Sequence, residues 1–197
     1  MPRTESNKIE LGAPAPEFVL HDASGRMYSL GDFDAAPALL VAFISNRCPF
    51  VLLIREELAR FAREHADKGL AILAINSNDA DAYAEETRAR VVAEAADQGY
   101  GFPYLKDEDQ VVARAFGAAC TPDLFLYDAN RRLAYHGQFD DARPGNGKPV
   151  TGADLRAAAD AVLKGERPAG PQVPSIGCNI KWLPGSMPAR LRAHAAA

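Results

Sequence analysis

The stretch Leu39-Leu-Val-Ala-Phe-Ile-Ser-Asn-Arg-Cys48-Pro49-Phe50-Val51 decides the fold, because its hydrophobic period changes in the middle. Its first six residues are all apolar, which is typical of a strand covered on both faces. From Phe50 onward, apolar residues recur every three or four positions among charged ones, as on an amphipathic helix that ends near Lys68. The stretch therefore predicts a buried strand, a turn and a helix.

Cys48 lies at the predicted start of this helix. Pro49 suits the first helical turn, because the amide hydrogen that proline lacks would have no partner there. Free amide groups and the positive end of the helix dipole favour a thiolate at this position, and the thiolate is the reactive form of cysteine. Free cysteines are often simply buried as small hydrophobic residues, but this position favours a redox role for Cys48.

The whole chain has the composition of a globular protein, with 197 residues, 48% of them apolar and 24% charged. The formal net charge is -4, and basic residues form no stripe, so we expect no nucleic-acid partner. No apolar run is long enough to cross a membrane, and residues 1–10 lack the apolar core of a secretion signal. Three cysteines without such a signal favour a cytoplasmic protein with reduced thiols.

The remaining pattern predicts an α/β fold in which a central mixed β-sheet is flanked by helices. A hairpin over residues 18–30 precedes the first buried strand. Thr121 and Pro122 directly precede a strand and are candidates for a cis peptide bond, which right-handed crossovers should bring close to Cys48. Further strands are expected over 70–75, 102–105, 124–127 and 133–136, and helices over 82–98, 108–116 and 152–164.

The last thirty residues differ in character from the rest. Five prolines between Pro168 and Pro188 exclude regular secondary structure over most of this segment. It also carries Cys178 and Trp182, the single tryptophan of the chain. We therefore predict a thioredoxin-like or redoxin domain over 9–167 and an irregular, Pro-rich C-terminal extension over 168–197 that docks on it.

Several motifs resemble the thioredoxin-fold redoxins, a group that includes the peroxiredoxins of the alkyl hydroperoxide reductase and thiol-specific antioxidant family. These motifs are Ala15-Pro-Glu-Phe-Val-Leu, Gly25 with Ser29-Leu, Val41-Ala-Phe-Ile-Ser-Asn-Arg-Cys-Pro and Thr121-Pro-Asp-Leu-Phe-Leu-Tyr-Asp. Shorter motifs resemble a peroxiredoxin-like bacterial subgroup: Asn46-Arg-Cys-Pro-Phe-Val, Phe102-Pro-Tyr-Leu, Asp107-Glu-Asp-Gln and Gly177-Cys-Asn-Ile-Lys-Trp. The resemblance implies a thioredoxin-like fold.

The resemblance aligns Cys48 with the attacking cysteine of a thioredoxin Cys-x-x-Cys motif, although Val51 occupies the position of the second cysteine. Peroxiredoxins place their peroxidatic cysteine near the position of Val51. If Cys48 is peroxidatic, Ser45 can supply the hydroxyl of the peroxiredoxin motif, but Val41 occupies the position of that motif's proline. Peroxidase activity therefore does not follow from the alignment alone.

Cys48 is the candidate nucleophile toward a protein disulfide or a peroxide. Either product, a mixed disulfide or a sulfenic acid, requires a second thiol. Cys178 is the first candidate because a mobile tail would carry it to the site, and Cys120 is the second because the resemblance places it before the cis-proline. For each, the alternative is a buried thiol without a redox role. The candidate substrate-binding residues are Asn46, Arg47, Thr121 and Pro122.

The sequence thus predicts a cytoplasmic, antioxidant-type oxidoreductase, either a thiol-disulfide oxidoreductase or a thiol peroxidase, that a cellular thiol reductant regenerates. The alternative is a non-catalytic binding or regulatory module that keeps the fold, since Val51 replaces the second cysteine of the motif. Histidines show no ligand spacing, and no Gly-rich loop joins a strand to a helix. We therefore predict no metal or other cofactor.

Overall fold

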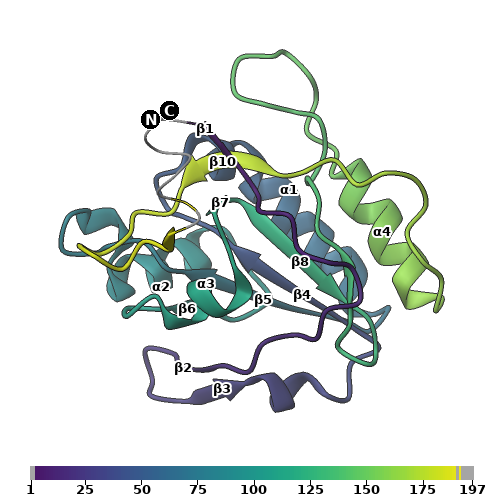
Figure 1. The fold of residues 1–197 in the computed structure, drawn as a ribbon, viewed down its shortest axis with the longest axis horizontal. Coiled ribbons are helices and arrows are strands. Elements are labelled where there is room, and N and C mark those ends of the chain that lie inside the picture. The colour runs from purple at the N-terminus through teal and green to yellow at the C-terminus, as the bar shows by residue number, and fades with distance from the viewer. Residues whose placement is uncertain (1–2, 190, 192–197) are drawn as a thin grey trace.

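The computed structural model describes residues 3–189 and 191. Its centre is a five-stranded sheet in the order β6-β5-β4-β8-β9 (Figure 1). The inner strands β4 and β5 and the edge strand β6 run parallel, whereas β8 and β9 are antiparallel to their neighbours, which confirms the mixed sheet. The strands are β4 (Ala38–Phe43), β5 (Leu70–Asn76), β6 (Tyr104–Lys106), β8 (Asp123–Tyr127) and β9 (Leu133–Tyr135).

Helices cover both faces of this sheet, as the sequence predicts. On one face, Phe61 of α1 (Pro49–Ala66) and Leu155 of α4 (Ala153–Leu163) belong to one hydrophobic core. On the other face, Phe116 of α3 (Val111–Phe116) lies with its ring centroid 5.5 Å from that of Phe43. Leu40 and Leu39 of β4 belong to the two opposite cores, so the strand is buried on both sides.

Two predicted helices begin later than expected. The helix predicted from residue 82 begins only at Arg88 as α2 (Arg88–Asp97), after the short 3-10 helix η2 (Ala84–Glu86), because Thr87 between them is extended. The helix predicted from residue 108 begins at Val111 because Gln110 is left-handed, with φ of 60°. The carboxylate of Asp107 accepts hydrogen bonds from the first free amide groups of α3.

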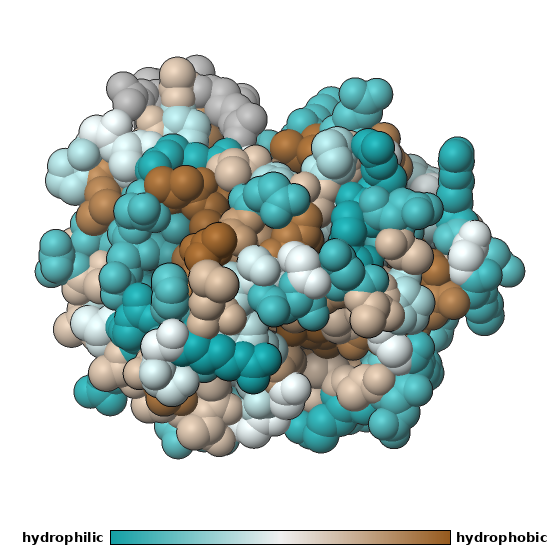
Figure 2. Space-filling model, turned by 90° about the horizontal axis from the view of Figure 1, so that it is seen from below, coloured by the Kyte–Doolittle hydropathy of each residue, from teal (hydrophilic) through white to brown (hydrophobic). Residues whose placement is uncertain are grey.

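The predicted N-terminal hairpin is present as β2 (Val19–His21) and β3 (Met27–Ser29), followed by the 3-10 helix η1 (Leu30–Phe33). It lies along the lower side of the molecule in Figure 1. Seen from that side, hydrophobic residues form small patches separated by hydrophilic ones (Figure 2). Among the described residues, no helix combines the length and apolar composition needed to cross a bilayer.

A second, three-stranded antiparallel sheet joins segments from both ends of the chain, in the order β1-β10-β7 (Figure 1). Its strands are β1 (Arg3–Glu5), β10 (Ile176–Asn179) and β7 (Cys120–Thr121). The Thr121–Pro122 peptide bond that follows β7 is cis, as the sequence suggested. The short strands β1 and β10 were not predicted, and β10 carries Cys178.

Candidate functional site

Cys48 is the N-cap residue of α1 and Pro49 its first helical residue, which confirms the predicted start of the helix. Ser45 stabilises the turn before the helix, because its Oγ accepts hydrogen bonds from the backbone N–H groups of Arg47 and Cys48, at 3.3 and 3.2 Å. The hydroxyl of Ser45 donates in turn to Oε1 of Glu86, at 2.5 Å. The hydroxyl hydrogen of Ser45 therefore points to Glu86 and is not donated to the sulfur of Cys48.

Strand β10 brings Cys178 to Cys48 from the other end of the chain. Cys178 lies opposite Thr121 in the pairing with β7. Gly177 makes this close approach possible, because a Cβ atom there would lie 1.9 Å from the carbonyl oxygen of Thr121. Cys48 and Cys178 belong to one buried cluster and are only 1% and 5% exposed, and each thiol is the largest influence on the pKa of the other. The two thiols are thus neighbours in the observed conformation, without any movement of the tail.

The surroundings of Cys48 favour its thiolate. The hydrogen bond from Cys178 lowers the pKa of Cys48 to about 6, with further hydrogen bonds from Thr121 and from the backbone N–H of Val51, although burial acts against the shift. The carbonyl oxygen of Thr121, 3.0 Å from Sγ of Cys48, can accept only from the protonated thiol. Donors to the sulfur outnumber this single acceptor, so the thiolate is the favoured form.

Cys178 shows the opposite shift. Its hydrogen bond with Cys48, followed by burial, raises the pKa of the Cys178 thiol. A proton shared between two thiols is expected to reside on one of them, which makes Cys178 the donor and Cys48 the acceptor. The pair therefore combines a nucleophile with a protonated neighbour.

Cys120, the second candidate partner, is fully buried on β7 and lies opposite Asn179 rather than Cys178. Its thiol donates a long hydrogen bond to the carbonyl oxygen of Pro122, at 3.5 Å. Burial, and then the charge of Asp123, raise the pKa of Cys120 well above its ordinary value. This environment favours a buried protonated thiol over a second resolving cysteine.

A buried polar network that the sequence analysis missed supports the loop before Cys48. The carboxylate of Glu86 has no exposed surface and accepts hydrogen bonds from Ser45 Oγ, from the backbone N–H of Asn46 at 3.2 Å and from Asn76 Nδ2 at 2.6 Å. Asn76 in turn accepts a hydrogen bond from Lys106 Nζ, at 3.1 Å. No signal in the sequence separates Glu86 from the exposed glutamates around it.

The proposed substrate-binding residues occupy different environments. The side chain of Asn46 is hydrogen-bonded within the protein. Its Oδ1 accepts a hydrogen bond from the hydroxyl of Tyr104 at 2.9 Å, and its Nδ2 donates one to the carbonyl oxygen of Glu85 at 2.8 Å. Thr121 and Pro122 lie directly beside Cys48, through the contact between the carbonyl oxygen of Thr121 and the sulfur. The structure thus brings together Cys48, Thr121 and Cys178, whereas Asn46 supports the loop.

Two cations lie at this site, Arg47, which precedes Cys48 in the chain, and Lys181, which interacts electrostatically with both thiols. The guanidinium group of Arg47 lies over the ring of Tyr83, 4.2 Å from its centroid. Lys181 follows β10, and its charge interacts with Cys178 and Cys48.

Comparisons with known proteins identify chains similar to this one. A solved structure of a hypothetical protein from Sinorhizobium meliloti 1021 is 69% identical, with a TM-score of 0.91 over 92% of this chain and all of that chain. The thiol-disulfide oxidoreductase ResA of Geobacillus thermodenitrificans is 26% identical over 130 residues, which are 66% of this chain and 70% of that protein.

A more distant structure identifies the fold. A thiol:disulfide interchange protein of the thioredoxin family from Chlorobium tepidum is 19% identical, with a TM-score of 0.60 over 80% of this chain and 99% of that chain. This likeness confirms the thioredoxin-like fold. The model of the AhpC/TSA family matches residues 11–136, which is more than half of the chain.

Proposed function

Because the chain belongs to the AhpC/TSA family, it is a thiol-based redox protein, and we propose that it acts as a thiol-disulfide oxidoreductase with Cys48 as nucleophile and Cys178 as resolving cysteine. The observation that carries this proposal is the pairing of β10 with β7, which places Cys178 opposite Thr121, the residue whose carbonyl oxygen lies 3.0 Å from Sγ of Cys48. A thiolate that lies beside a second, protonated thiol has its resolving partner within reach.

The exchange proceeds in two displacements. The Cys48 thiolate attacks one sulfur of the substrate disulfide, whose S–S bond breaks and releases one thiolate. Cys178 then loses its proton and attacks Sγ of Cys48, which releases the second substrate thiol and leaves a Cys48–Cys178 disulfide. Two electrons pass from the dithiol to the substrate, and a cellular thiol reductant restores the dithiol by the reverse sequence.

We place this reaction in the cytoplasm. The three cysteines of the chain are free, and the proposed cycle requires that the dithiol be reduced between turnovers. Glutathione and thioredoxin systems keep thiols reduced in the cytoplasm.

Peroxide reduction is the second candidate, and the burial of Cys48 favours it. A residue that is 1% exposed is reached more readily by a peroxide than by a loop of another protein. The Cys48 thiolate would attack the O–O bond, giving a sulfenic acid and an alcohol or water, and Cys178 would then condense with it and release water. Both candidates use the same two sulfurs.

The test is to oxidise the reduced protein with one equivalent of hydroxyethyl disulfide or hydrogen peroxide and to map the cysteines by mass spectrometry. We expect a Cys48–Cys178 bond with Cys120 left as a thiol. Cys48→Ser should abolish consumption of either oxidant, and Cys178→Ser should trap a mixed disulfide or a sulfenic acid on Cys48. The oxidant that reacts faster distinguishes the two candidate reactions.

Cys120→Ser separates the two candidate partners, because it should still form the Cys48–Cys178 bond. Recovery of a Cys48–Cys120 bond from the oxidised wild type would show that Cys120, and not Cys178, is the resolving cysteine. Full activity in Cys48→Ser would exclude Cys48 as the nucleophile. A wild-type protein that consumes neither oxidant and has a Cys48 pKa at or above about 8.5 would leave only the non-catalytic binding module.

A further inference from the structure

Two cations beside the dithiol have no carboxylate partner among the described residues. Nζ of Lys181 donates to two neutral acceptors of one residue, the carbonyl oxygen and Oδ1 of Asn179, at 2.7 and 2.6 Å. Arg47 rests on Tyr83, and its buried Nη1 has no hydrogen-bond partner in the part of the chain that the structure describes. Burying a guanidinium N–H without an acceptor costs free energy. The site is therefore suited to bind an anion.

A second unpartnered donor lies next to Lys181. The side chain of Asn78 is 4% exposed, and its Oδ1 accepts a hydrogen bond from the backbone N–H of Lys181, at 2.8 Å. Its Nδ2 is buried and finds no acceptor among the described residues. Most buried side-chain donors are paired in native proteins, so this atom independently indicates that an acceptor is missing here.

The acidic group whose charge acts on Lys181, Glu86, is already engaged. Glu86 accepts hydrogen bonds from the loop before Cys48 and from the side-chain amide of Asn76. The buried Lys106 donates a hydrogen bond to the oxygen of that same Asn76 amide. The charges of Glu86 and Lys106 therefore offset each other within the network. The positive charge that remains is that of Arg47 and Lys181.

The unmatched charge and the dithiol share one electrostatic environment. Arg47 repels the charge of Lys181, whereas Cys178 and Cys48 attract it, so the other three groups all act on Lys181. A site lined by one sign of charge with low-dielectric walls raises the local concentration of ligands of the opposite sign. The fork of an arginine matches a carboxylate in geometry as well as in charge.

We propose that Arg47 and Lys181 bind the carboxylate of a small disulfide, so that the dithiol exchanges preferentially with anionic substrates of low molecular weight. This inference rests on the proposed function. The burial of Cys48 and Cys178 favours a small molecule over an exposed loop of a protein. The bound carboxylate would accept hydrogen bonds from donors that are otherwise unpaired, while one substrate sulfur meets Cys48.

The test uses three small linear disulfides that differ in charge: dithiodipropionate, which is anionic, hydroxyethyl disulfide, which is neutral, and cystamine, which is cationic. The rate of Cys48–Cys178 bond formation is measured by acid quenching and mass spectrometry. Each rate is divided by the rate of the same disulfide with free dithiothreitol, which corrects for intrinsic reactivity. We expect the normalised rate to fall by roughly tenfold from the anionic to the neutral probe, and to fall further with cystamine.

Arg47→Gln and Lys181→Gln should each reduce this preference, and Arg47→Lys, which keeps the charge, should retain part of it. Lys164→Gln, the same change at the exposed end of α4, should leave the preference unchanged. Equal normalised rates for the three probes, or a preference that survives in both glutamine variants, would overturn the inference. Faster exchange with a protein disulfide such as insulin than with dithiodipropionate would also overturn it.

These outcomes are distinct from failure of the proposed function. If the dithiol does not carry out exchange, none of the three disulfides is consumed, and Cys48→Ser behaves like the wild type. If exchange occurs without charge selection, all three are consumed in a Cys48-dependent way at similar normalised rates. The two ideas can therefore be rejected separately.

Discussion

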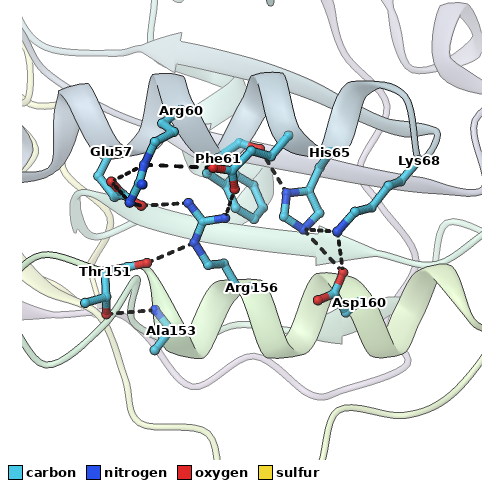
Figure 3. A network of polar contacts seen from close by, with 10 residues as sticks. Glu57, Arg60, Phe61, His65, Lys68, Thr151, Ala153, Arg156 and Asp160 are labelled. Carbon is cyan, nitrogen blue, oxygen red and sulfur yellow. Dashed lines mark hydrogen bonds and ion pairs between the residues drawn. The ribbon is translucent and has the colours of Figure 1, made fainter.

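The two ends of helix α1 differ in whether their charged groups are paired. Toward its C-terminal end, charges of opposite sign are matched between α1 and α4 (Figure 3). Arg156 of α4 pairs with Glu57 at 2.6 Å and also with Glu64. Asp160 of α4 pairs with Lys68 at 2.9 Å and lies 3.4 Å from Nε2 of His65. Every cation in this group meets a carboxylate, and most of the side chains are partly exposed.

At the N-terminal end, the functional groups are buried and their charges are not matched. The thiolate of Cys48 is stabilised by neutral donors, and the nearby Arg47 and Lys181 lack carboxylate partners among the described residues. The difference teaches that the same helix serves two purposes. Matched charges at one end join α1 to α4. The unmatched groups at the other end are the ones that we propose bind a substrate.

The largest effect is expected from Gly177→Ala. The added Cβ would lie 1.9 Å from the carbonyl oxygen of Thr121, so β10 must separate from β7 and withdraw Cys178 from Cys48. We expect intramolecular disulfide formation to slow by about a hundredfold, because the attacking thiol loses its position. The measurement is the rate of Cys48–Cys178 bond formation after stoichiometric oxidation.

Gly101→Ala is the matched control, because a Cβ at Gly101 would meet no atom within 4 Å. It should leave the rate of disulfide formation unchanged. An unimpaired rate in Gly177→Ala would show that β10 need not approach β7 so closely, and the contrast between the two ends of α1 would lose its main structural support.

The next effect concerns the pH dependence of Cys48. Its folded pKa is lowered, so its reactivity should rise as pH increases through about 6 and level off above that value. Cys178→Ala removes the donor that contributes most to this shift. The midpoint should then move toward about 8.5, and alkylation of Cys48 at pH 7 should slow by roughly tenfold or more.

Cys178→Ser provides the comparison for that experiment, because its hydroxyl can still donate to the Cys48 sulfur. We expect its midpoint to lie between those of the wild type and the alanine variant. The measurement is the alkylation rate of Cys48 as a function of pH, with the modified residue identified by mass. Identical midpoints in all three proteins would remove Cys178 as the source of the low pKa.

A smaller effect on reactivity is expected from Glu86→Gln. The carboxylate accepts from Asn46 N–H and Asn76 Nδ2, and an amide nitrogen placed there would face a donor. Leaving a buried donor unpaired should lower the free energy of unfolding by about 1–3 kcal/mol. Because Ser45 would be less firmly held, the pKa of Cys48 should rise by roughly half a unit, or about threefold in thiolate at low pH.

Glu85→Gln is the matched control for this variant, because its side chain is exposed and only its backbone carbonyl contacts Asn46. Denaturant unfolding and the alkylation profile of Cys48 should both stay at the wild-type values. A Glu86→Gln protein that loses stability while its alkylation profile is unchanged would limit Glu86 to a structural role.

The helix start at Cys48 and the neighbouring Thr121–Pro122 bond were predictable because local signals mark them, namely a change of hydrophobic period and a proline before a strand. The position of Cys178 beside Cys48 was harder to predict from the sequence. It depends on the pairing of β10 with β1 and β7, strands of four residues or fewer. Strands this short do not show the alternation of apolar and polar residues that identifies a strand in a sequence. Glu86 was missed because its burial depends on tertiary contacts with Ser45 and Asn76, which leave no periodic trace.

The smallest effect should come from the other end of the helix. Arg156→Gln removes the ion pairs with Glu57 and Glu64 while keeping a polar side chain of similar length. Partly exposed ion pairs contribute little, so the free energy of unfolding should fall by about 1 kcal/mol. High salt should diminish the difference between variant and wild type, because it screens such pairs. The alkylation profile of Cys48 should be unchanged, and a shifted midpoint would mean that the two ends of α1 are coupled through the helix rather than independent.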